Sequence, residues 1–287
     1  MITSNEKANF NDTDQVYYLV TDNHIHYRKN GFTAHSSHII KKKNGLYINK
    51  VTGEVIPNPK KSDLKIQNQQ SLIRSYRNLF YTIENYVDTF KHSVMITLDY
   101  KKPQTNLDSL SHDFDCFIKR LKRYIKKVYP TYHYEYIRIN EPHEKLFEGK
   151  PKWHIHLIIF GIAFIHIEDI RNLWKQGSAY IKSYTNRNGE SAAKYFCGFL
   201  NAPEHTESKN ELDIKRSSKK RRLKYYTSGT DLFSTSRGIK TPTFRRGIYG
   251  KIKKKYPGET LNEGSRTIVI DGKIVNRFDY MNQKLIK

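Results

Sequence analysis

The segment Lys152–Phe160, KWHIHLIIF, is the most apolar strand candidate in this sequence. A nearly continuous apolar run of this length is typical of a strand that lies inside a core. Side chains two residues apart share one face of a strand, so His154 and His156 point together, away from Ile155 and Leu157. The fold must therefore be built around a buried strand that carries two imidazoles on one face.

The apolar spacing predicts further elements on both sides of this strand. A helix is predicted over residues 62–90, with Ser62 as its N-cap, and a polar loop over 142–151. From residue 93 to residue 200 the predicted order is strand, helix, strand, strand, helix, strand, helix. The strands cover 93–100, 132–140, 152–160 and 179–184, and the helices cover 107–128, 168–175 and 191–200.

This order predicts an α+β domain with a central antiparallel sheet flanked by helices, of the ferredoxin or RNA-recognition-motif type. We expect this core to span residues 61–204. Residues 1–60 mix short alternating segments with turn clusters, which indicates a β-rich N-terminal extension. Residues 205–287 begin with the run KRSSKKRRLK, which indicates a basic, DNA-contacting C-terminal region with short strands.

The charge balance indicates a polyanionic partner. The sequence has 51 Lys and Arg against 28 Asp and Glu, a formal net charge of +23. This excess is larger than solubility requires and is typical of nucleic-acid-binding proteins. We therefore expect DNA or RNA as the partner.

The sequence does not favour a membrane or secreted protein. Its longest apolar run, 153–167, contains three histidines and is too short and polar to span a bilayer. The first residues, MITSNEKANFNDTD, lack the basic start and apolar stretch of a secretory signal. Two cysteines, Cys116 and Cys197, are too few for a disulfide scaffold. We expect a cytoplasmic location and no membrane partner.

His154 and His156 are candidate metal ligands, because neutral imidazole is the commonest nitrogen ligand for divalent metals. If residues 132–140 and 152–160 form an antiparallel hairpin, Glu141 ends the first strand beside His154 and would complete the site. The register is assumed here, so three other residues remain as substitutes: His143, Glu144 and Glu148. A pair of packed or surface histidines without metal is the alternative.

Other families with a His-x-His pattern fit less well. Histidine-triad hydrolases need a third alternating histidine where this sequence has Ile158, and cupins need a carboxylate near Phe160 and Gly161. A second pair, His24 and His26, is similar to a motif of metal-dependent amidohydrolases. Those enzymes need a βα barrel, which this sequence does not predict. We interpret the second pair as incidental.

The segment KPKWHIHLIIFG, preceded by RINE, resembles the His-hydrophobic-His motif of rolling-circle replication initiators, which are HUH endonucleases. MITLDY resembles their first motif. LWKQGSAYIKSY resembles the segment that precedes their tyrosine helix, which corresponds here to SAAKYFCGFL and contains Tyr195. RLKYYTSGTDLFSTSRGIKTP resembles a basic segment that follows it. The resemblance covers roughly residues 93–245.

The resemblance implies a chemistry. Tyr195 would attack one phosphodiester of single-stranded origin DNA with Mg²⁺ or Mn²⁺ at Glu141, His154 and His156, and leave a 5′-phosphotyrosine and a free 3′-hydroxyl. Tyr184 and Tyr180 are alternative nucleophiles. Packing of Tyr195 in the core is also open, because it shares a helical stripe with other apolar residues.

Basic residues are expected to contact DNA phosphates, and Tyr225 and Tyr226 to stack on bases. The predicted DNA-binding residues are Lys194, Lys219, Lys220, Arg221, Arg222, Arg245 and Arg246, with the basic helix 119–127. The sequence has no helicase P-loop of the form GxxxxGK[ST], so a host helicase and polymerase are expected partners. A transposase or relaxase with the same chemistry, and a non-catalytic nucleic-acid-binding protein, are the alternatives.

Overall fold

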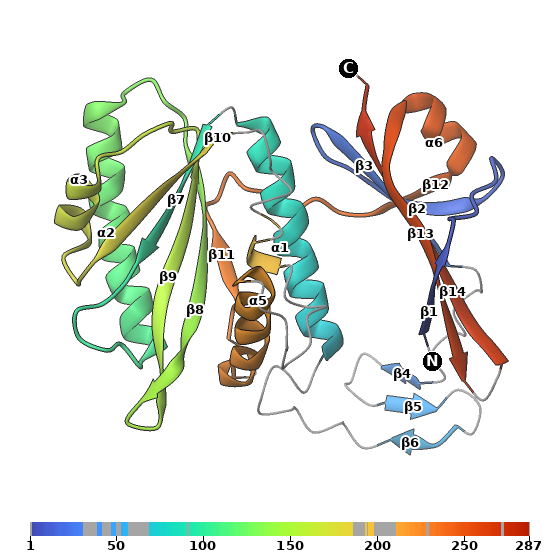
Figure 1. Ribbon diagram of the computed structural model, residues 1–287, viewed down its shortest axis with the longest axis horizontal. Coiled ribbons are helices and arrows are strands. Elements are labelled where there is room, and N and C mark those ends of the chain that lie inside the picture. The colour runs from blue at the N-terminus through green and yellow to red at the C-terminus, as the bar shows by residue number, and fades with distance from the viewer. Residues whose placement is uncertain are drawn as a thin grey trace. The chain divides into compact units, whose positions relative to one another are not determined.

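The computed structural model in Figure 1 forms two compact units. Unit 1 combines Met1–Lys61 with Pro242–Lys287, and unit 2 is Ser62–Thr241. The two end segments form one unit because their strands pair in one sheet, a long-range pairing that composition does not reveal. The structure describes residues 2–30, 39–41, 47–49, 53–56, 69–90, 92–185, 193, 195–197, 211–227, 230–270 and 273–286.

Unit 2 is built on a five-stranded sheet in the order β10-β7-β9-β8-β11, and every neighbouring pair is antiparallel. Along the chain its elements run β7, α2, β8, β9, α3, β10, which is the β-α-β-β-α-β order of ferredoxin-type domains. The predicted α+β class is therefore confirmed. The bounds are β7 His92–Leu98, α2 Leu107–Val128, β8 Glu135–Phe147, β9 Lys150–Phe160, α3 Ile167–Trp174, β10 Ala179–Thr185 and β11 Phe233–Thr235.

Helices cover both faces of this sheet, with α2 and α3 on one side and α1 (Gln69–Thr89) and α5 (Glu211–Arg221) on the other (Figure 1). The amide side chain of Asn106 caps α2 by accepting from two backbone N–H groups of the first turn. The apolar stripe of α2 is fully buried. On the other side, the ring of Tyr86 in α1 lies 5.9 Å from that of Phe160 in β9. The central strand β9 is therefore covered on both faces, as its composition predicts.

The polar loop predicted over 142–151 is wrong. Strand β8 continues to Phe147 and β9 starts at Lys150, so the two strands are joined by Glu148 and Gly149 alone. Both turn residues have positive φ, 49° and 75°, as in a type I′ hairpin turn. The residues are polar because this end of the ribbon is exposed, which the sequence pattern does not distinguish from a loop.

Unit 1 contains a six-stranded sheet in the order β1-β13-β14-β3-β2-β12, followed in the chain after β12 by the short helix α6 (Tyr249–Lys255). Its small core is Val16, Ile25, Tyr27, Tyr249 and Met281. The strands are β1 Ile2–Glu6, β2 Gln15–Val20, β3 His24–Asn30, β12 Arg245–Ile248, β13 Gly258–Ile270 and β14 Lys273–Leu285. A three-stranded sheet of β4 (Ile39–Lys41), β5 (Tyr47–Asn49) and β6 (Val55–Ile56) completes it.

The prediction of short strands in the C-terminal region is wrong, because β13 and β14 have 13 residues each. Polar residues dominate both strands, so hydrophobic alternation gives a weak signal, and backbone pairing carries the ribbon. The second histidine pair lies in this unit. His26 is buried, and its Nδ1 lies 2.6 Å from Asn282 Oδ1 on β14.

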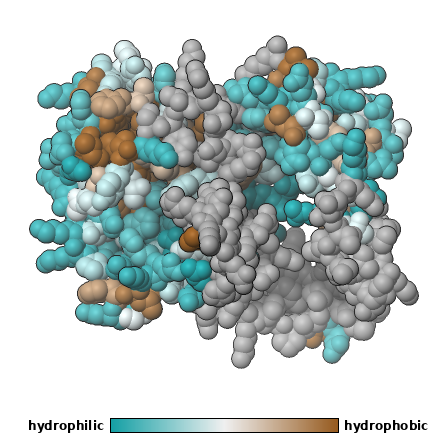
Figure 2. All heavy atoms as spheres, viewed as in Figure 1, coloured by the Kyte–Doolittle hydropathy of each residue, from teal (hydrophilic) through white to brown (hydrophobic). Residues whose placement is uncertain are grey.

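The described surface in the view of Figure 2 is mainly hydrophilic, with smaller groups of hydrophobic side chains. Among the helices that the structure describes, none combines the length and the hydropathy needed to cross a membrane. This agrees with the high content of charged residues in the sequence.

Candidate metal centre and neighbouring tyrosine

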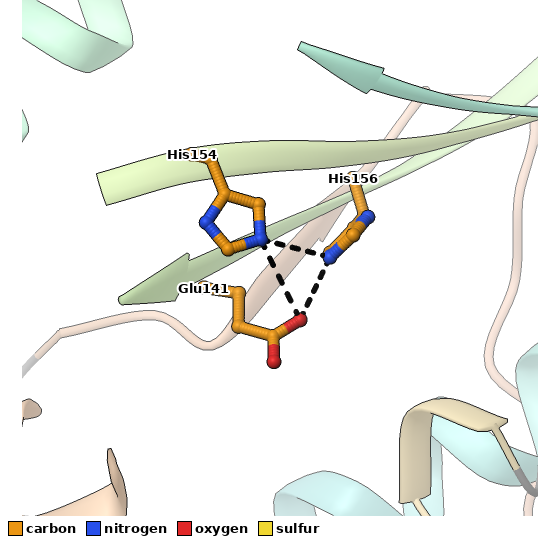
Figure 3. A group of neighbouring side chains, drawn as sticks. All are labelled: Glu141, His154 and His156. Carbon is orange, nitrogen blue, oxygen red and sulfur yellow. Dashed lines mark hydrogen bonds and ion pairs between the residues drawn. The ribbon is translucent and has the colours of Figure 1, made fainter. Parts of the chain in front are cut away.

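Glu141, His154 and His156 meet on the face of the sheet that is covered by α1 and α5 (Figure 3). Glu141 pairs directly with His154 across the β8–β9 hairpin, which is the register assumed from the sequence. His156 Nε2 lies 2.8 Å from Glu141 Oε2 and 3.0 Å from His154 Nε2. The third distance, from His154 Nε2 to Glu141 Oε2, is 3.9 Å. Two nitrogens thus converge on one carboxylate oxygen.

All three side chains are buried, and their ligand atoms lie within 4.8 Å of one another. This group can therefore hold a metal ion. The three substitutes considered for Glu141 have other surroundings. Glu144 pairs with Arg221, Glu148 forms the hairpin turn, and His143 faces Asp99.

The surroundings of the two imidazoles fit a bound cation. Thr97 Oγ1 on β7 lies 3.0 Å from His156 Nδ1. If Nδ1 donates its hydrogen to this hydroxyl, the lone pair of Nε2 points at the centre, as in metal sites that fix the tautomer through the second nitrogen. Nδ1 of His154 is buried and has no hydrogen-bond partner among the described residues. Burial, reinforced by His156, lowers the pKa of His154 to about 3, which keeps this ring in the neutral, ligating form.

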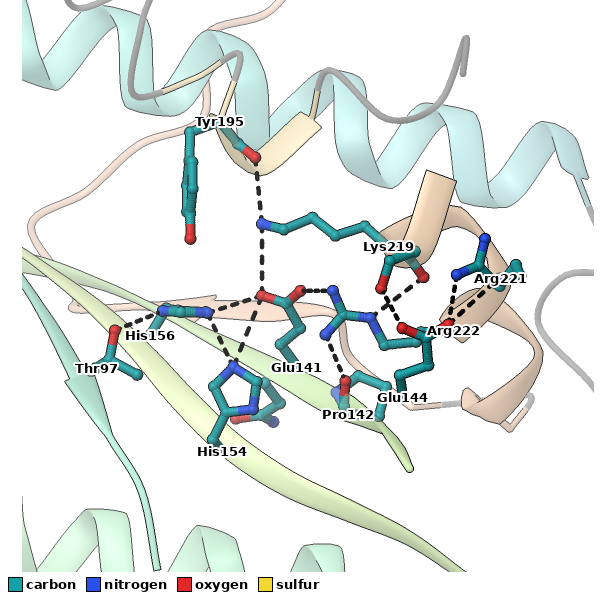
Figure 4. A network of polar contacts seen from close by, with 12 residues as sticks. Thr97, Glu141, Pro142, Glu144, His154, His156, Tyr195, Lys219, Arg221 and Arg222 are labelled. Carbon is teal, nitrogen blue, oxygen red and sulfur yellow. Dashed lines mark hydrogen bonds and ion pairs between the residues drawn. The ribbon is translucent and has the colours of Figure 1, made fainter. Parts of the chain in front are cut away.

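Two cations neutralise the carboxylate (Figure 4). Lys219 Nζ lies 3.6 Å from Glu141 Oε2, and Arg222 binds Oε1 at 3.1 Å and the carbonyl of Pro142 at 2.9 Å. Burial raises the pKa of the Glu141 carboxyl, but Lys219 and the two histidines outweigh it and hold this pKa well below its usual value. Glu141 is therefore an anion at neutral pH, as a metal ligand must be.

Tyr195 lies beside the cluster. Its ring centroid is 6.4 Å from that of His156, and Lys219 Nζ is 4.0 Å from the centre of the Tyr195 ring. Tyr195, Phe196 and Cys197 are helical, as predicted for this segment. Phe196 and Cys197 are buried, whereas Tyr195 is 37% exposed. The core-facing side of this turn is thus formed by its neighbours, and Tyr195 faces the cluster (Figure 4).

The two alternative tyrosines are placed differently. Tyr180 is 63% exposed on the edge strand β10 and pairs with Thr97, which in turn pairs with His156. It therefore lies on the same face of the sheet as the cluster, two strands away from β9. The side chain of Tyr184 lies outside the described part of the structure.

The predicted DNA-binding residues fall into three groups. Lys219 and Arg222 are largely buried against Glu141, and Arg221 pairs with Glu144. Lys220 is half-buried at the end of α5, and Lys194 lies outside the described residues. In unit 1, two exposed arginines of β12 complete the set, Arg245 and Arg246.

Sequence reasoning missed several residues of the site. Thr97 belongs to the segment MITLDY, but its contact with His156 depends on the pairing of β7 with β9. Asp99 follows it, and its Oδ1 lies 3.4 Å from His143 Nε2. The His143 ring is 4.4 Å from that of His154. The hydrogen bond with His143 lowers the pKa of Asp99. Only the parity of the strands, with odd positions of β7 on the histidine face, offers a signal in the sequence.

The fold and the cluster together define a class: an α+β domain in which two histidines and a carboxylate can hold a metal ion next to a tyrosine. Residues 93–201 match the family model of the replication-associated protein ORF2, which identifies the chain as a replication initiator of phage and plasmid type. The matched segment includes the cluster and Tyr195, whereas α5 lies beyond it. No curated protein and no solved structure matches the chain.

Proposed function

We propose that this replication initiator is an HUH-type endonuclease that nicks single-stranded origin DNA by attack of Tyr195 on one phosphodiester, and that it rejoins strands by the reverse step. The observation that carries the proposal is the position of the Tyr195 ring, 6.4 Å from the ring of His156 in the buried cluster. A tyrosine beside a group that can hold a metal ion supplies both a nucleophile and a site for a phosphate.

In the proposed reaction the Tyr195 oxygen forms a bond to phosphorus, and its proton passes to solvent. The bond from phosphorus to the 3′-oxygen of the preceding nucleotide breaks, and that oxygen takes up a proton. The products are a 5′-phosphotyrosine and a free 3′-hydroxyl. The covalent link conserves the energy of the broken bond, so the same residue can later return the strand to a hydroxyl.

Each residue of the cluster has a role in this proposal. Glu141, His154 and His156 would hold Mg²⁺ or Mn²⁺, which would polarise the scissile phosphate and stabilise charge on its oxygens. Mn²⁺ accepts imidazole more readily than Mg²⁺ does. Thr97 orients His156 through Nδ1. Asp99 orients His143, whose ring packs against His154.

The proposed partners follow from charge and products. Lys194, Lys220, Arg245 and Arg246 would contact DNA phosphates, and the net charge of +23 favours such contacts. A host helicase would unwind the duplex, and a host polymerase would extend the free 3′-hydroxyl. The reaction would take place in the cytoplasm of the host cell.

The proposal is tested with the full chain, Mn²⁺ and single-stranded DNA of its own origin. We expect a covalent protein–DNA band in denaturing gels, which disappears with a chelator and in the Tyr195→Phe variant. DNA binding by that variant should persist, because only one hydroxyl is removed. If no band forms with Mn²⁺ or Mg²⁺ while the DNA is bound, the protein is a non-catalytic DNA-binding protein and the proposal is wrong.

A further inference from the structure

Lys219 is a buried cation placed between the carboxylate of the cluster and the tyrosine. Its side chain is 11% exposed, although it belongs to a helix that ends in three basic residues. The ammonium has three neighbours: Glu141 Oε2 at 3.6 Å, the carbonyl oxygen of Tyr195 at 3.3 Å, and the Tyr195 ring at 4.0 Å from its centre. A surface lysine that binds DNA phosphates would not be buried in this way.

Two cations contact Glu141, and they do so at different oxygens. Arg222 binds Oε1 and the Pro142 carbonyl, both outside the histidine cluster. Lys219 approaches Oε2, the oxygen that also faces His156. A divalent cation held by the two histidines and Oε2 would repel Lys219 but leave Arg222 in place. The two remaining neighbours of the ammonium both belong to Tyr195.

We propose that Lys219 serves Tyr195: its fixed positive charge stabilises the negative charge that develops on the tyrosine oxygen and the scissile phosphate during attack. This inference rests on the proposed function. Lys219 keeps its protons throughout, and the phenol proton passes to solvent as described above. A preorganised charge in a site shielded from water stabilises a transition state more than the same charge in water does.

The position of Lys219 has a second consequence. Its charge lies near the same carboxylate oxygen that a divalent cation would use, so it weakens metal binding while it assists attack. A lysine that only neutralised Glu141 for folding would have no separate effect on the rate. The lysine lies outside the segment that matches the family, so its assignment depends on these contacts alone.

The test compares Lys219→Met, Lys219→Arg and the control Lys224→Met in the full chain. Lys224 belongs to η3 (Arg222–Tyr225) and is exposed, with its ammonium over the ring of Tyr225. One measurement is the single-turnover rate of covalent adduct formation at saturating Mn²⁺. The other is the affinity for Mn²⁺ alone, by calorimetry without DNA.

We expect Lys219→Met to slow adduct formation about a hundredfold, the usual effect of removing one preorganised stabilising group. We expect the same variant to bind Mn²⁺ about tenfold more tightly, because one nearby positive charge is lost. Lys219→Arg should recover part of the rate, and Lys224→Met should match the unmodified chain in both measurements. Tighter metal binding by Lys219→Met also shows that this variant is folded.

Two results would overturn the inference alone. One is an adduct rate for Lys219→Met equal to that of Lys224→Met; the other is weaker Mn²⁺ binding together with a slower rate, which marks a structural role. Failure of the proposed function looks different. In that case the unmodified chain forms no adduct, or Tyr195→Phe still forms one, and the inference is wrong with it.

Discussion

Thr97 contributes one hydroxyl to the site, and its partner is the nitrogen of His156 that faces away from Glu141. Replacing Thr97 by Val keeps the shape of the side chain but removes this hydrogen bond. We expect Mn²⁺ affinity to fall about 10- to 100-fold, as for other groups that orient a ligating histidine. Thr97→Ser should retain most of the affinity in calorimetry. Equal affinities for the valine and serine variants would contradict this role.

Glu141 compensates two buried cations, Lys219 and Arg222, so its loss should affect folding as well as metal binding. We expect Glu141→Gln to lower the free energy of unfolding by about 3–5 kcal/mol, the typical cost of leaving a buried charge unpaired. Urea unfolding followed by the fluorescence of Trp153 and Trp174, both in unit 2, measures this change.

The matched control is Glu144→Gln on the same strand. Glu144 is 48% exposed and pairs with Arg221, so its loss should cost less than about 1 kcal/mol. Similar losses in the two variants would contradict the description of Glu141 as the buried centre of a charge cluster.

Individual site residues were predictable from the sequence where local spacing determines them. The alternation in β9 places His154 and His156 on one face, and a simple hairpin places Glu141 opposite. Lys219 was predicted to bind DNA phosphates, whereas the structure packs it against Glu141 and Tyr195. Such contacts depend on how α5 packs on the sheet, which no local pattern determines.

At the scale of elements, the β8–β9 hairpin aligns the cluster, and its turn has a specific backbone requirement. Gly149 has φ 75° and open space around its Cα, so a methyl group there meets no atom but strains the backbone. We expect Gly149→Ala to lower the free energy of unfolding by about 1 kcal/mol.

The neighbouring turn position provides the opposite test. Glu148 has φ 49°, a conformation that Asn tolerates better than Glu. Glu148→Asn should therefore raise the free energy of unfolding by a few tenths of a kcal/mol. Thermal and urea unfolding measure both variants, and a stabilising Gly149→Ala would exclude the type I′ turn.

The elements themselves were predictable to different degrees. Helix α2 and strand β9 agree closely with their predicted ranges, because amphipathic spacing and continuous apolar runs are strong signals. The end of β8 was predicted as a loop, since an exposed two-stranded ribbon has the polar composition of a loop. Strands β13 and β14 were predicted as short for the same reason.

At the scale of the whole molecule, basic residues continue into unit 1. Residues 242–257 contain six Lys and Arg and no acidic residue, and Arg245, Arg246 and the lysines of α6 are exposed. We expect the double variant Arg245→Glu, Arg246→Glu to weaken DNA binding and to reduce the slope of log affinity against log salt by about 2.

This variant should leave Mn²⁺ affinity unchanged, because both arginines belong to unit 1 and the cluster belongs to unit 2. Lys150→Glu, an exposed charge reversal at the hairpin tip, is the control for net charge. An unchanged salt slope would contradict DNA contact by β12. Composition indicated that this region is basic, but the joining of both chain ends in one unit depends on strand pairing across the whole sequence.

The most direct test of the central claim is to locate the covalent bond. After reaction with Mn²⁺ and origin DNA, nuclease and trypsin digestion should leave the peptide 195–209, YFCGFLNAPEHTESK, and mass spectrometry identifies any nucleotide on it. We predict a 5′-phosphonucleotide on Tyr195. A nucleotide on Tyr180 or Tyr184, or on no tyrosine at all, would contradict the account.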